Sequence, residues 1–181
     1  IRHFPALART KPDAIWRHVN RAQPSLIRVE ADEVTYNLHI CLRFELEVDL
    51  IEGRLTVDEL PARWNQAMVD YLGVTPPDDA HGVLQDVHWS GGMFGYFPSY
   101  TLGNLYGAQI TETAEREIPR FWGKVQAGEL APIREWLREN VHRHGRVYLP
   151  DELVRRVTGS GLSAEPFLRY VRTKYSEVYG L

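Results

Sequence analysis

The chain has 181 residues, of which 44% are hydrophobic and 25% charged, a composition typical of a globular domain with a sizeable core and not of a disordered chain. Its 21 Lys and Arg against 24 Asp and Glu give a net charge of −3, which argues against a dedicated nucleic-acid binder. No apolar run approaches the roughly 20 residues that span a membrane, and the single cysteine, Cys41, fits a reducing, cytoplasmic compartment.

The chain is expected to be one helical domain over residues 1–181, because no internal repeat, low-complexity tract or linker divides it. It begins at Ile1 without an initiator methionine, so we expect a fragment or a processed product. The first predicted helix begins at Thr10-Lys11-Pro12-Asp13 and runs to about Arg21.

The next segment carries two conflicting patterns. From Val34 to Leu50 every even position is apolar, which taken alone indicates a strand. A strand of about 17 residues exceeds the usual length of about 3–10, and no Gly or Pro interrupts the segment. We therefore predict a helix capped by Ser25 and ended by Gly53, packed on most of its sides.

Clear local signals mark the later elements. Thr56-Val57-Asp58-Glu59 is a capping box that predicts a helix running to Leu72 and stopping at Gly73. Residues 82–107 interleave glycines with aromatic residues, a composition that favours a cleft over a plain core. Further helices are predicted over 99–117, 118–126, 131–144, 151–158 and 163–179.

A polar stripe lies within the second predicted helix. Its members are spaced by three or four residues, which places them on one helical face: Arg28, Asp32, Thr35, His39 and Arg43. The plain interpretation is a solvated face with an Arg28–Asp32 ion pair, a contact that contributes only tenths of a kcal/mol. Because the rest of the helix is predicted to be buried, we expect the stripe to line a cavity.

A second candidate is the pair Asp86 and His88. A histidine beside a carboxylate supports general acid–base chemistry, although a structural histidine is the commoner case. His142 and His144 are interpreted as surface residues near a helix C-terminus and not as metal ligands. The chain contains no His-Glu-x-x-His, Cys-x-x-Cys, Gly-x-Ser-x-Gly or phosphate-loop motif, so the residues alone predict only a mostly helical domain with a candidate cleft.

Two motifs carry a family resemblance. Ile27-Arg28-Val29-Glu30-Ala31-Asp32 resembles the Ile-Arg-x-x-Ala-Asp motif of the carboxypeptidase Taq family, and Gly82-Val83-Leu84-Gln85-Asp86-Val87-His88-Trp89 resembles its Gly-x-x-Gln-Asp-x-His-Trp motif. The likeness continues through residues 90–106 and extends over nearly the whole chain. It implies an all-α fold, the C-terminal portion of a helical, cleft-containing metallocarboxypeptidase, which favours the helix at 34–50.

The resemblance also implies what this chain lacks. The family binds its metal, zinc or another divalent ion such as cobalt, through His-Glu-x-x-His and a later His-Glu-Ser motif, and neither occurs here. The metal ligands and the general-base Glu would therefore lie in a missing N-terminal half, and this chain alone is expected to be inactive. The implied partners are peptide substrates, that missing half and a second copy in a homodimer.

The family's reaction is the attack of metal-activated water on the last peptide bond, which forms a tetrahedral oxyanion. By resemblance, His88 and Tyr96 are the catalytic candidates that stabilise it. Tyr100 would be a nearby substrate contact, although the order of the two tyrosines stays open. Arg28 would hold the C-terminal carboxylate.

The remaining site candidates support these groups. Asp32 would orient Arg28, while Gln85 and Asp86 would shape the turn that presents His88. Two alternatives remain: a metal-free helical binding or assembly module with a relict cleft, and a helical enzyme that uses His88 and Asp86 without metal. An upstream His-Glu-x-x-His in the source gene would separate the metallocarboxypeptidase hypothesis from the metal-free module.

Overall fold

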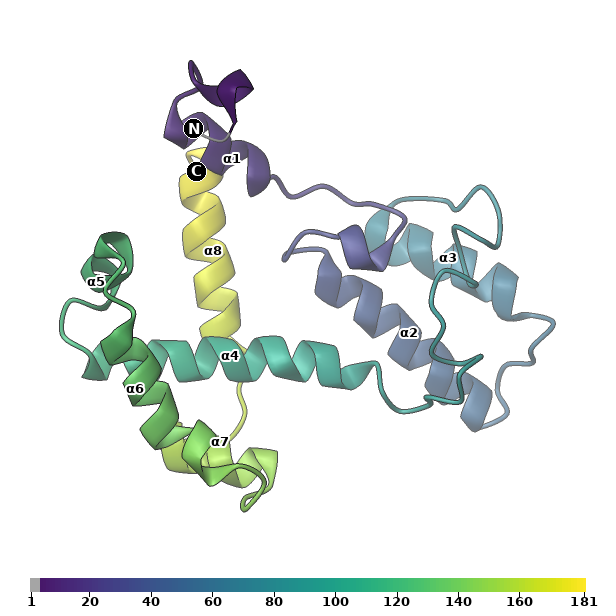
Figure 1. Ribbon diagram of the computed structural model, residues 1–181. Helices are drawn as coiled ribbons and strands as arrows, with labels where there is room; N and C mark the ends of the chain where they lie inside the picture. Colours follow the sequence, from purple (N-terminus) through teal and green to yellow (C-terminus); the bar gives the residue numbers. More distant parts are fainter. Residues whose placement is uncertain (1–3) are drawn as a thin grey trace. The chain divides into compact units, whose positions relative to one another are not determined.

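The computed structural model describes residues 4–181, and the secondary structure in this range is entirely helical (Figure 1). The all-α fold predicted from the sequence is confirmed. The helices are η1 (Pro5–Leu7), α1 (Pro12–Val19), η2 (Arg28–Glu30), α2 (Tyr36–Ile51), α3 (Leu60–Leu72), α4 (Pro98–Glu117), α5 (Phe121–Ala127), α6 (Ala131–Asn140), η3 (His142–His144), α7 (Pro150–Thr158) and α8 (Glu165–Tyr179).

The described residues form two compact units. One comprises the residues up to Thr101 together with Lys174–Leu181, and the other comprises Leu102–Thr173. Both boundaries fall inside helices, α4 and α8, which is why no linker signal appears in the sequence. The single domain expected over residues 1–181 stays a prediction. No helix among the described residues combines the length and apolar character needed to cross a bilayer.

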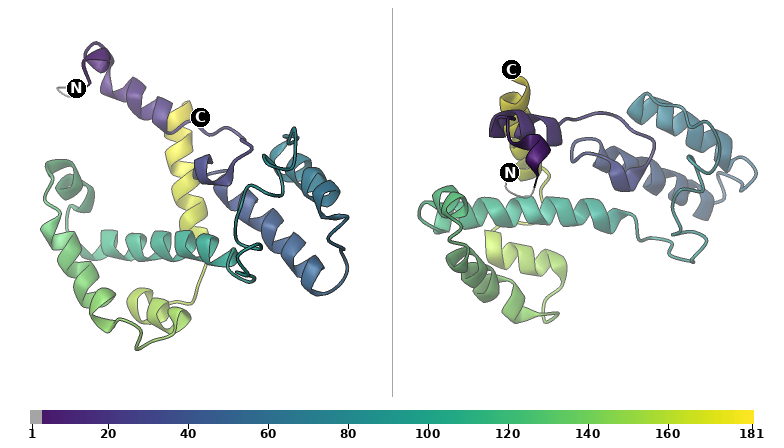
Figure 2. Two further views of the ribbon diagram at one scale, coloured as in Figure 1. Left: turned by 45° about the vertical axis from the view of Figure 1, so that its right-hand side comes forward. Right: turned by 45° about the horizontal axis from the view of Figure 1, so that its top comes forward.

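The core of the first unit lies between α2 and α3, which run side by side in each view (Figures 1 and 2). Its buried apolar side chains are Leu42, Leu46, Leu55, Leu60, Trp64, Met68 and Leu72. The spacing of three or four residues along each helix places these side chains on facing stripes. The apolar residues predicted to pack around α2 thus form the centre of this unit.

The predicted C-terminal end of α3 is confirmed, but the α-helix begins at Leu60 and not directly after Thr56. The Glu59 carboxylate accepts a hydrogen bond from the Thr56 backbone N–H (3.0 Å), and the Thr56 hydroxyl oxygen accepts one from the Glu59 backbone N–H (3.4 Å), as a capping box requires. The α-helix begins at Leu60 and ends at Leu72, and Gly73 follows with a φ of 69°, the left-handed conformation that glycine adopts without steric cost.

The long segment before α3 is helical, as predicted, but the helix begins at Tyr36 and not at Ser25. The Asp32 carboxylate accepts hydrogen bonds from the backbone N–H groups of Val34 (2.9 Å) and Thr35 (3.0 Å). This turn gives the backbone a local alternative to the helix, and Ala31 before it is extended, with a ψ of 145°. The predicted continuous helix from Ser25 is therefore wrong.

The second unit contains most of α4, then α5, α6, α7 and the first part of α8, close to the predicted bounds. The buried Gln109 of α4 fixes the turn between α7 and α8. Its amide donates to the Thr158 hydroxyl (3.2 Å), the Ser160 hydroxyl (3.0 Å) and the Gly161 carbonyl (2.9 Å), and accepts from the Ser163 N–H (3.1 Å). The predicted helix over 131–144 ends earlier, at Asn140, and the short helix η3 holds His142 and His144.

Candidate active site

The candidate site lies in the first unit, where the segment between α3 and α4 packs against α2. This segment, residues 73–97, contains Gln85, Asp86, His88 and Tyr96, and the first turns of α4 add Tyr100. It contacts α2 through Arg43 and Glu47. These two residues and His39 follow one another at intervals of four on one side of the helix, which we call the polar face of α2. All three side chains of this face are buried.

Two arginines share the Asp86 carboxylate. Arg28, which is 5% exposed, donates to it from Nε (3.1 and 3.2 Å) and Nη2 (2.5 Å), and Arg43, which is fully buried, donates from Nε at 2.6 Å. Burial by itself would raise the pKa of Asp86, but the two guanidinium groups outweigh it and hold the pKa below its usual value. Asp86 is therefore an ionised carboxylate that binds two cations.

This arrangement corrects the prediction that Asp32 orients Arg28. The ionic partner of Arg28 is Asp86, while both oxygens of Asp32 bind the turn before α2 and the backbone N–H of Gln23 (2.8 Å). The predicted pairing assumed that Arg28 and Asp32 are neighbours on one helix. They are not, because Arg28 lies in η2 and the helix begins only at Tyr36.

Gln85 fixes the segment directly before Asp86. Its side-chain oxygen accepts from the backbone N–H of Arg28 (3.0 Å) and from Nη2 of Arg43 (2.8 Å). Its side-chain nitrogen donates to the carbonyls of Leu26 (2.9 Å) and His81 (3.0 Å). All the hydrogen-bonding capacity of this amide is thereby used to join three segments of the chain.

His88 is buried among aromatic rings, with 5% of its surface exposed. Its Nε2 lies 2.9 Å from the Tyr100 hydroxyl oxygen, and its Nδ1 lies 3.7 Å from the nearer Asp86 oxygen. Burial, together with the charges of Arg28 and Arg43, lowers the pKa of His88 despite the opposing effect of Asp86. The imidazole is therefore neutral at neutral pH.

The structure brings the two predicted tyrosines together beside His88. The ring centroid of Tyr96 lies 5.8 Å from that of His88 and 5.4 Å from that of Tyr100. Tyr96 is 49% exposed, whereas Tyr100 is half-buried and its ring lies 4.9 Å from the Arg28 guanidinium carbon. Six of the seven predicted site residues thus form one connected cluster, and Asp32 acts on it only through the turn before α2.

The interpretation of a solvated face is wrong for Arg43 and His39, because both side chains are fully buried, and Nη1 of Arg43 donates to the His39 carbonyl at 2.8 Å. Glu47 was missed, although it continues the four-residue spacing of His39 and Arg43. Its carboxylate accepts from Trp89 Nε1 (2.7 Å) and from the Gly95 N–H (2.6 Å).

We find no group of three or more His, Cys, Asp or Glu side chains between residues 4 and 181 that could hold a metal ion. His88 and Asp86 are near each other, but Asp86 is occupied by two arginines. The side chains of this site therefore offer hydrogen bonds and positive charge to a ligand.

The sequence of this chain is similar to known proteins of one family. A model of the family described as "Carboxypeptidase Taq (M32) metallopeptidase" matches residues 2–175. Thermostable carboxypeptidase 1 of Thermus thermophilus is 52% identical over 162 residues, covering 90% of this chain and 32% of that protein. Carboxypeptidase 1 of Bacillus subtilis is 46% identical over 167 residues, covering 92% of this chain and 33% of that protein.

Solved structures agree with these matches. The crystal structure of an M32 carboxypeptidase from Deinococcus radiodurans aligns with a TM-score of 0.95 and 44% identity, covering 98% of this chain and 36% of that one. A Pyrococcus furiosus carboxypeptidase structure aligns with a TM-score of 0.93 and 41% identity, covering 96% and 35%. This chain spans about a third of the length of the curated relatives it matches.

Proposed function

The chain belongs to the carboxypeptidase Taq (M32) metallopeptidase family, and we propose that it forms the substrate-side part of a metal-dependent carboxypeptidase. The whole enzyme would hydrolyse the last peptide bond of peptides and release C-terminal amino acids. The observation that carries this proposal is the cluster of Arg28, Asp86, His88, Tyr96 and Tyr100, which combines positive charge with hydroxyl donors beside a neutral imidazole.

The metal that the family description implies is not accommodated by the residues described here. Between residues 4 and 181 there is no ligand set for it, so we assign no step of the reaction to a metal held by this chain. We propose that zinc, or another divalent ion such as cobalt, binds in the remainder of the enzyme. Elemental analysis of the full-length protein after dialysis tests this proposal.

Arg28 is proposed to bind the free C-terminal carboxylate of the substrate. Two guanidinium groups share the single charge of Asp86, so the cluster keeps a residual positive charge that attracts an anion. Nη1 of Arg28 bonds Tyr36 (2.9 Å) and Nη2 bonds Asp86, and each of these nitrogens carries a second N–H. A carboxylate could accept both.

The tyrosines are proposed to act on the reacting carbonyl group. Because Asp86 lies nearer to Nδ1 of His88, its charge favours a proton on Nδ1, and Nε2 then accepts the hydroxyl proton of Tyr100. That bond leaves Tyr96, on its half-exposed ring, as the donor to the tetrahedral oxyanion. The His88–Tyr100 pair lies at its side and contacts the substrate.

The same geometry weighs against a metal-free enzyme that uses Asp86 as a base. A carboxylate held by two arginines has a depressed pKa and is a weak proton acceptor. The alternative of a metal-free binding or assembly module is separated by the source gene, which would lack His-Glu-x-x-His upstream of Ile1.

The decisive experiment uses the full-length protein, assayed on a blocked dipeptide and on its C-terminal amide, before and after treatment with a chelator. We expect cleavage of the acid only, loss of activity on chelation and recovery on adding zinc or cobalt. Equal cleavage of the amide, or activity that withstands removal of all metal, would contradict the proposal.

The assembly and location of the protein are also proposals. We propose that the protein is a homodimer, which the family resemblance supports. We also propose that it lies in the cytoplasm, which the single cysteine of this chain supports. Gel filtration with light scattering and cell fractionation test these two statements, respectively.

A further inference from the structure

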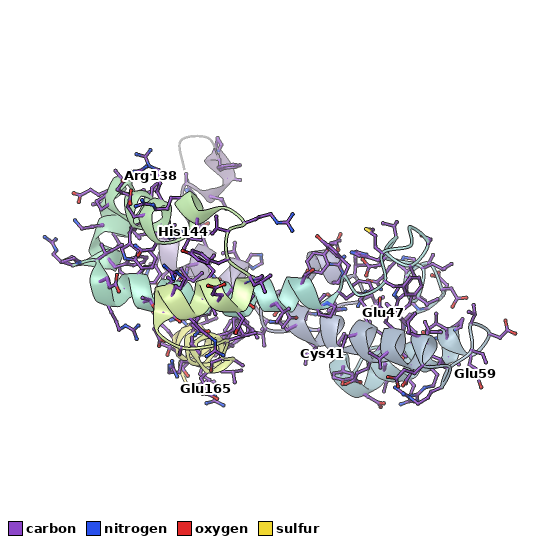
Figure 3. All side chains as sticks on the ribbon, turned by 90° about the horizontal axis from the view of Figure 1, so that it is seen from below. Cys41, Glu47, Glu59, Arg138, His144 and Glu165 are labelled. Carbon is purple, nitrogen blue, oxygen red and sulfur yellow. The ribbon has the colours of Figure 1, made fainter. Side chains whose placement is uncertain are left out.

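Glu47 is a buried carboxylate in the second half of α2, 4% exposed, whose two oxygens both bind the loop that carries the candidate site. One oxygen accepts the indole N–H of Trp89 at 2.7 Å, and the other accepts the backbone N–H of Gly95 at 2.6 Å. These donors lie at the two ends of residues 89–95, which we call the 89–95 loop. Figure 3 labels Glu47 in the part of the chain that contains α2 and α3.

The two ends of the 89–95 loop adjoin the proposed reactive groups. Trp89 follows His88 directly, and Gly95 precedes Tyr96 directly. A carboxylate that fixes both ends therefore fixes the separation of His88 from Tyr96, whose ring centroids lie 5.8 Å apart.

The loop's own bonds leave this task to Glu47. The backbone N–H groups of Gly91, Gly92 and Met93 donate to the carbonyls of Val87 (2.9 Å), Trp89 (3.0 Å) and His88 (2.8 Å), so these bonds hold the loop only as far as Met93. Gly95 has a φ of 78°, in the left-handed region that glycine adopts without steric cost, and its N–H donates to Glu47 of α2. Trp89 is held by edge contacts with the rings of Trp64 (6.1 Å) and Phe97 (5.8 Å).

We propose that Glu47 is a positioning residue for the proposed reaction. By binding both ends of the 89–95 loop, it sets the position of Tyr96 relative to His88. This inference rests on the proposed function for its kinetic consequences. Glu47 itself touches neither substrate nor reacting atoms; it acts through the loop. A bond to a charged acceptor is stronger than one between neutral groups, which suits a clamp that must hold a loop without a helix or sheet to support it.

The test compares Glu47→Gln with Glu45→Gln in the full-length protein. The amide of Glu47→Gln has almost the shape of the carboxylate but only one acceptor oxygen, so either Trp89 or Gly95 loses its acceptor. Glu45 is the matched control: it lies on the same helix, is exposed, and accepts from the Tyr71 hydroxyl at 2.6 Å, away from the loop.

For Glu47→Gln we expect hydrogen exchange of the amides in residues 89–96 to be about tenfold faster, with exchange of α3 unchanged. We expect kcat to fall about 10- to 100-fold with KM changed less than about threefold, since small misplacements of reacting groups have effects of this order. Glu45→Gln should change neither quantity. Unchanged loop exchange in Glu47→Gln would overturn the proposal, whether or not the parent protein is active.

A double-mutant cycle separates positioning from general support of the structure. If Glu47 acts through Tyr96, adding Glu47→Gln to Tyr96→Phe should lower kcat much less than it does in the parent. Losses that multiply would overturn the positioning role.

If Glu47→Gln fails to fold, Trp89→Phe removes one donor and keeps the carboxylate. This variant should accelerate hydrogen exchange over the same residues, and unchanged exchange there would also overturn the proposal.

Discussion

At the scale of single residues, Asp86 and Tyr36 together affect the pKa of Arg28 more strongly than its burial does. Burial by itself would lower the pKa of Arg28, but Asp86 and Tyr36 raise it above its ordinary value. The fully buried Arg43 shows the opposite balance: burial and the nearby Arg28 lower its pKa to about 10, still well above neutrality. Both groups are therefore cations at neutral pH, and Arg28 is the less buried of the two.

Replacing Arg28 with Ala in the full-length enzyme should raise KM and lower kcat/KM about 30- to 1,000-fold, the effect of losing a bidentate, charge-assisted pair of about 2–4 kcal/mol. The preference for a free C-terminal carboxylate should largely disappear. Steady-state rates on a blocked dipeptide and its amide measure both effects. A variant that discriminates acid from amide as the parent does would show that Arg28 only supports Asp86.

Replacing Tyr96 with Phe should lower kcat about 10²- to 10³-fold with little change in KM, because an oxyanion donor acts mainly in the transition state. Tyr100→Phe is the matched control, since it removes a hydroxyl that His88 already binds at 2.9 Å. We expect the smaller kcat effect there, measured under the same conditions. The reverse order would assign the oxyanion to Tyr100.

At the scale of secondary structure, Asp32 has a specific role in the turn that begins α2. Its four hydrogen bonds hold Gln23, Val34 and Thr35 in place before the first helical residue. The carboxylate thus fixes where α2 starts and, with it, the position of the polar face.

Asp32→Ala should therefore lower the stability of the folded protein by about 1–2 kcal/mol, the usual effect of losing such a capping group. Asp32→Asn keeps one acceptor oxygen and should lose less. Thermal unfolding measures the loss. The discrimination between acid and amide should stay unchanged in both variants; its loss would restore the prediction that Asp32 orients Arg28.

The sequence predicts elements well where the signal is local. The capping box at Thr56 and the glycine after α3 involve residues only a few positions apart, so the capping box and the C-terminal end of that helix were predicted, although the helix begins at Leu60. The alternating pattern at 34–50 favoured a strand by itself, and length and the family resemblance decided for the helix. The start of α2 was wrong because an aspartate turn competes with a helix through bonds that a helical wheel does not show.

The partners in the site depend on distant segments. Asp86 binds Arg28 and Arg43, which lie far from it along the chain, and no spacing rule relates them. Glu47 was within reach of sequence reasoning, because it extends the four-residue spacing of the polar face. Its role was not, because the acceptor of the Gly95 N–H depends on how the loop folds over α2.

At the scale of the whole molecule, the buried His39 makes the stability of the fold depend on pH. Burial, with the charges of Arg43 and Arg28, lowers its pKa from 6.5 to about 4. Between these values the unfolded chain holds a proton that the folded chain does not, so protonation favours unfolding there. The stability contributed by neutral His39 is complete above pH about 6.5 and is lost as the pH falls toward 4.

Lowering the pH from 7 to 4.5 should therefore reduce the unfolding free energy by an amount of the order of 2–3 kcal/mol through His39. His39→Asn should remove much of this dependence, whereas His142→Asn, at an exposed histidine, should keep it. Unfolding at a series of pH values measures the difference. The same slope in both variants would show that another group is responsible.

The sharing of one carboxylate by two arginines also bears on how far this site tolerates change. Losing either arginine leaves a balanced pair of opposite charges, whereas losing Asp86 leaves two buried cations facing each other, a penalty of several kcal/mol. The three positions therefore differ in how many substitutions leave the protein folded. In a library of all substitutions at these positions, selected for folded protein, survivors should be common at Arg28, fewer at Arg43 and rarest at Asp86.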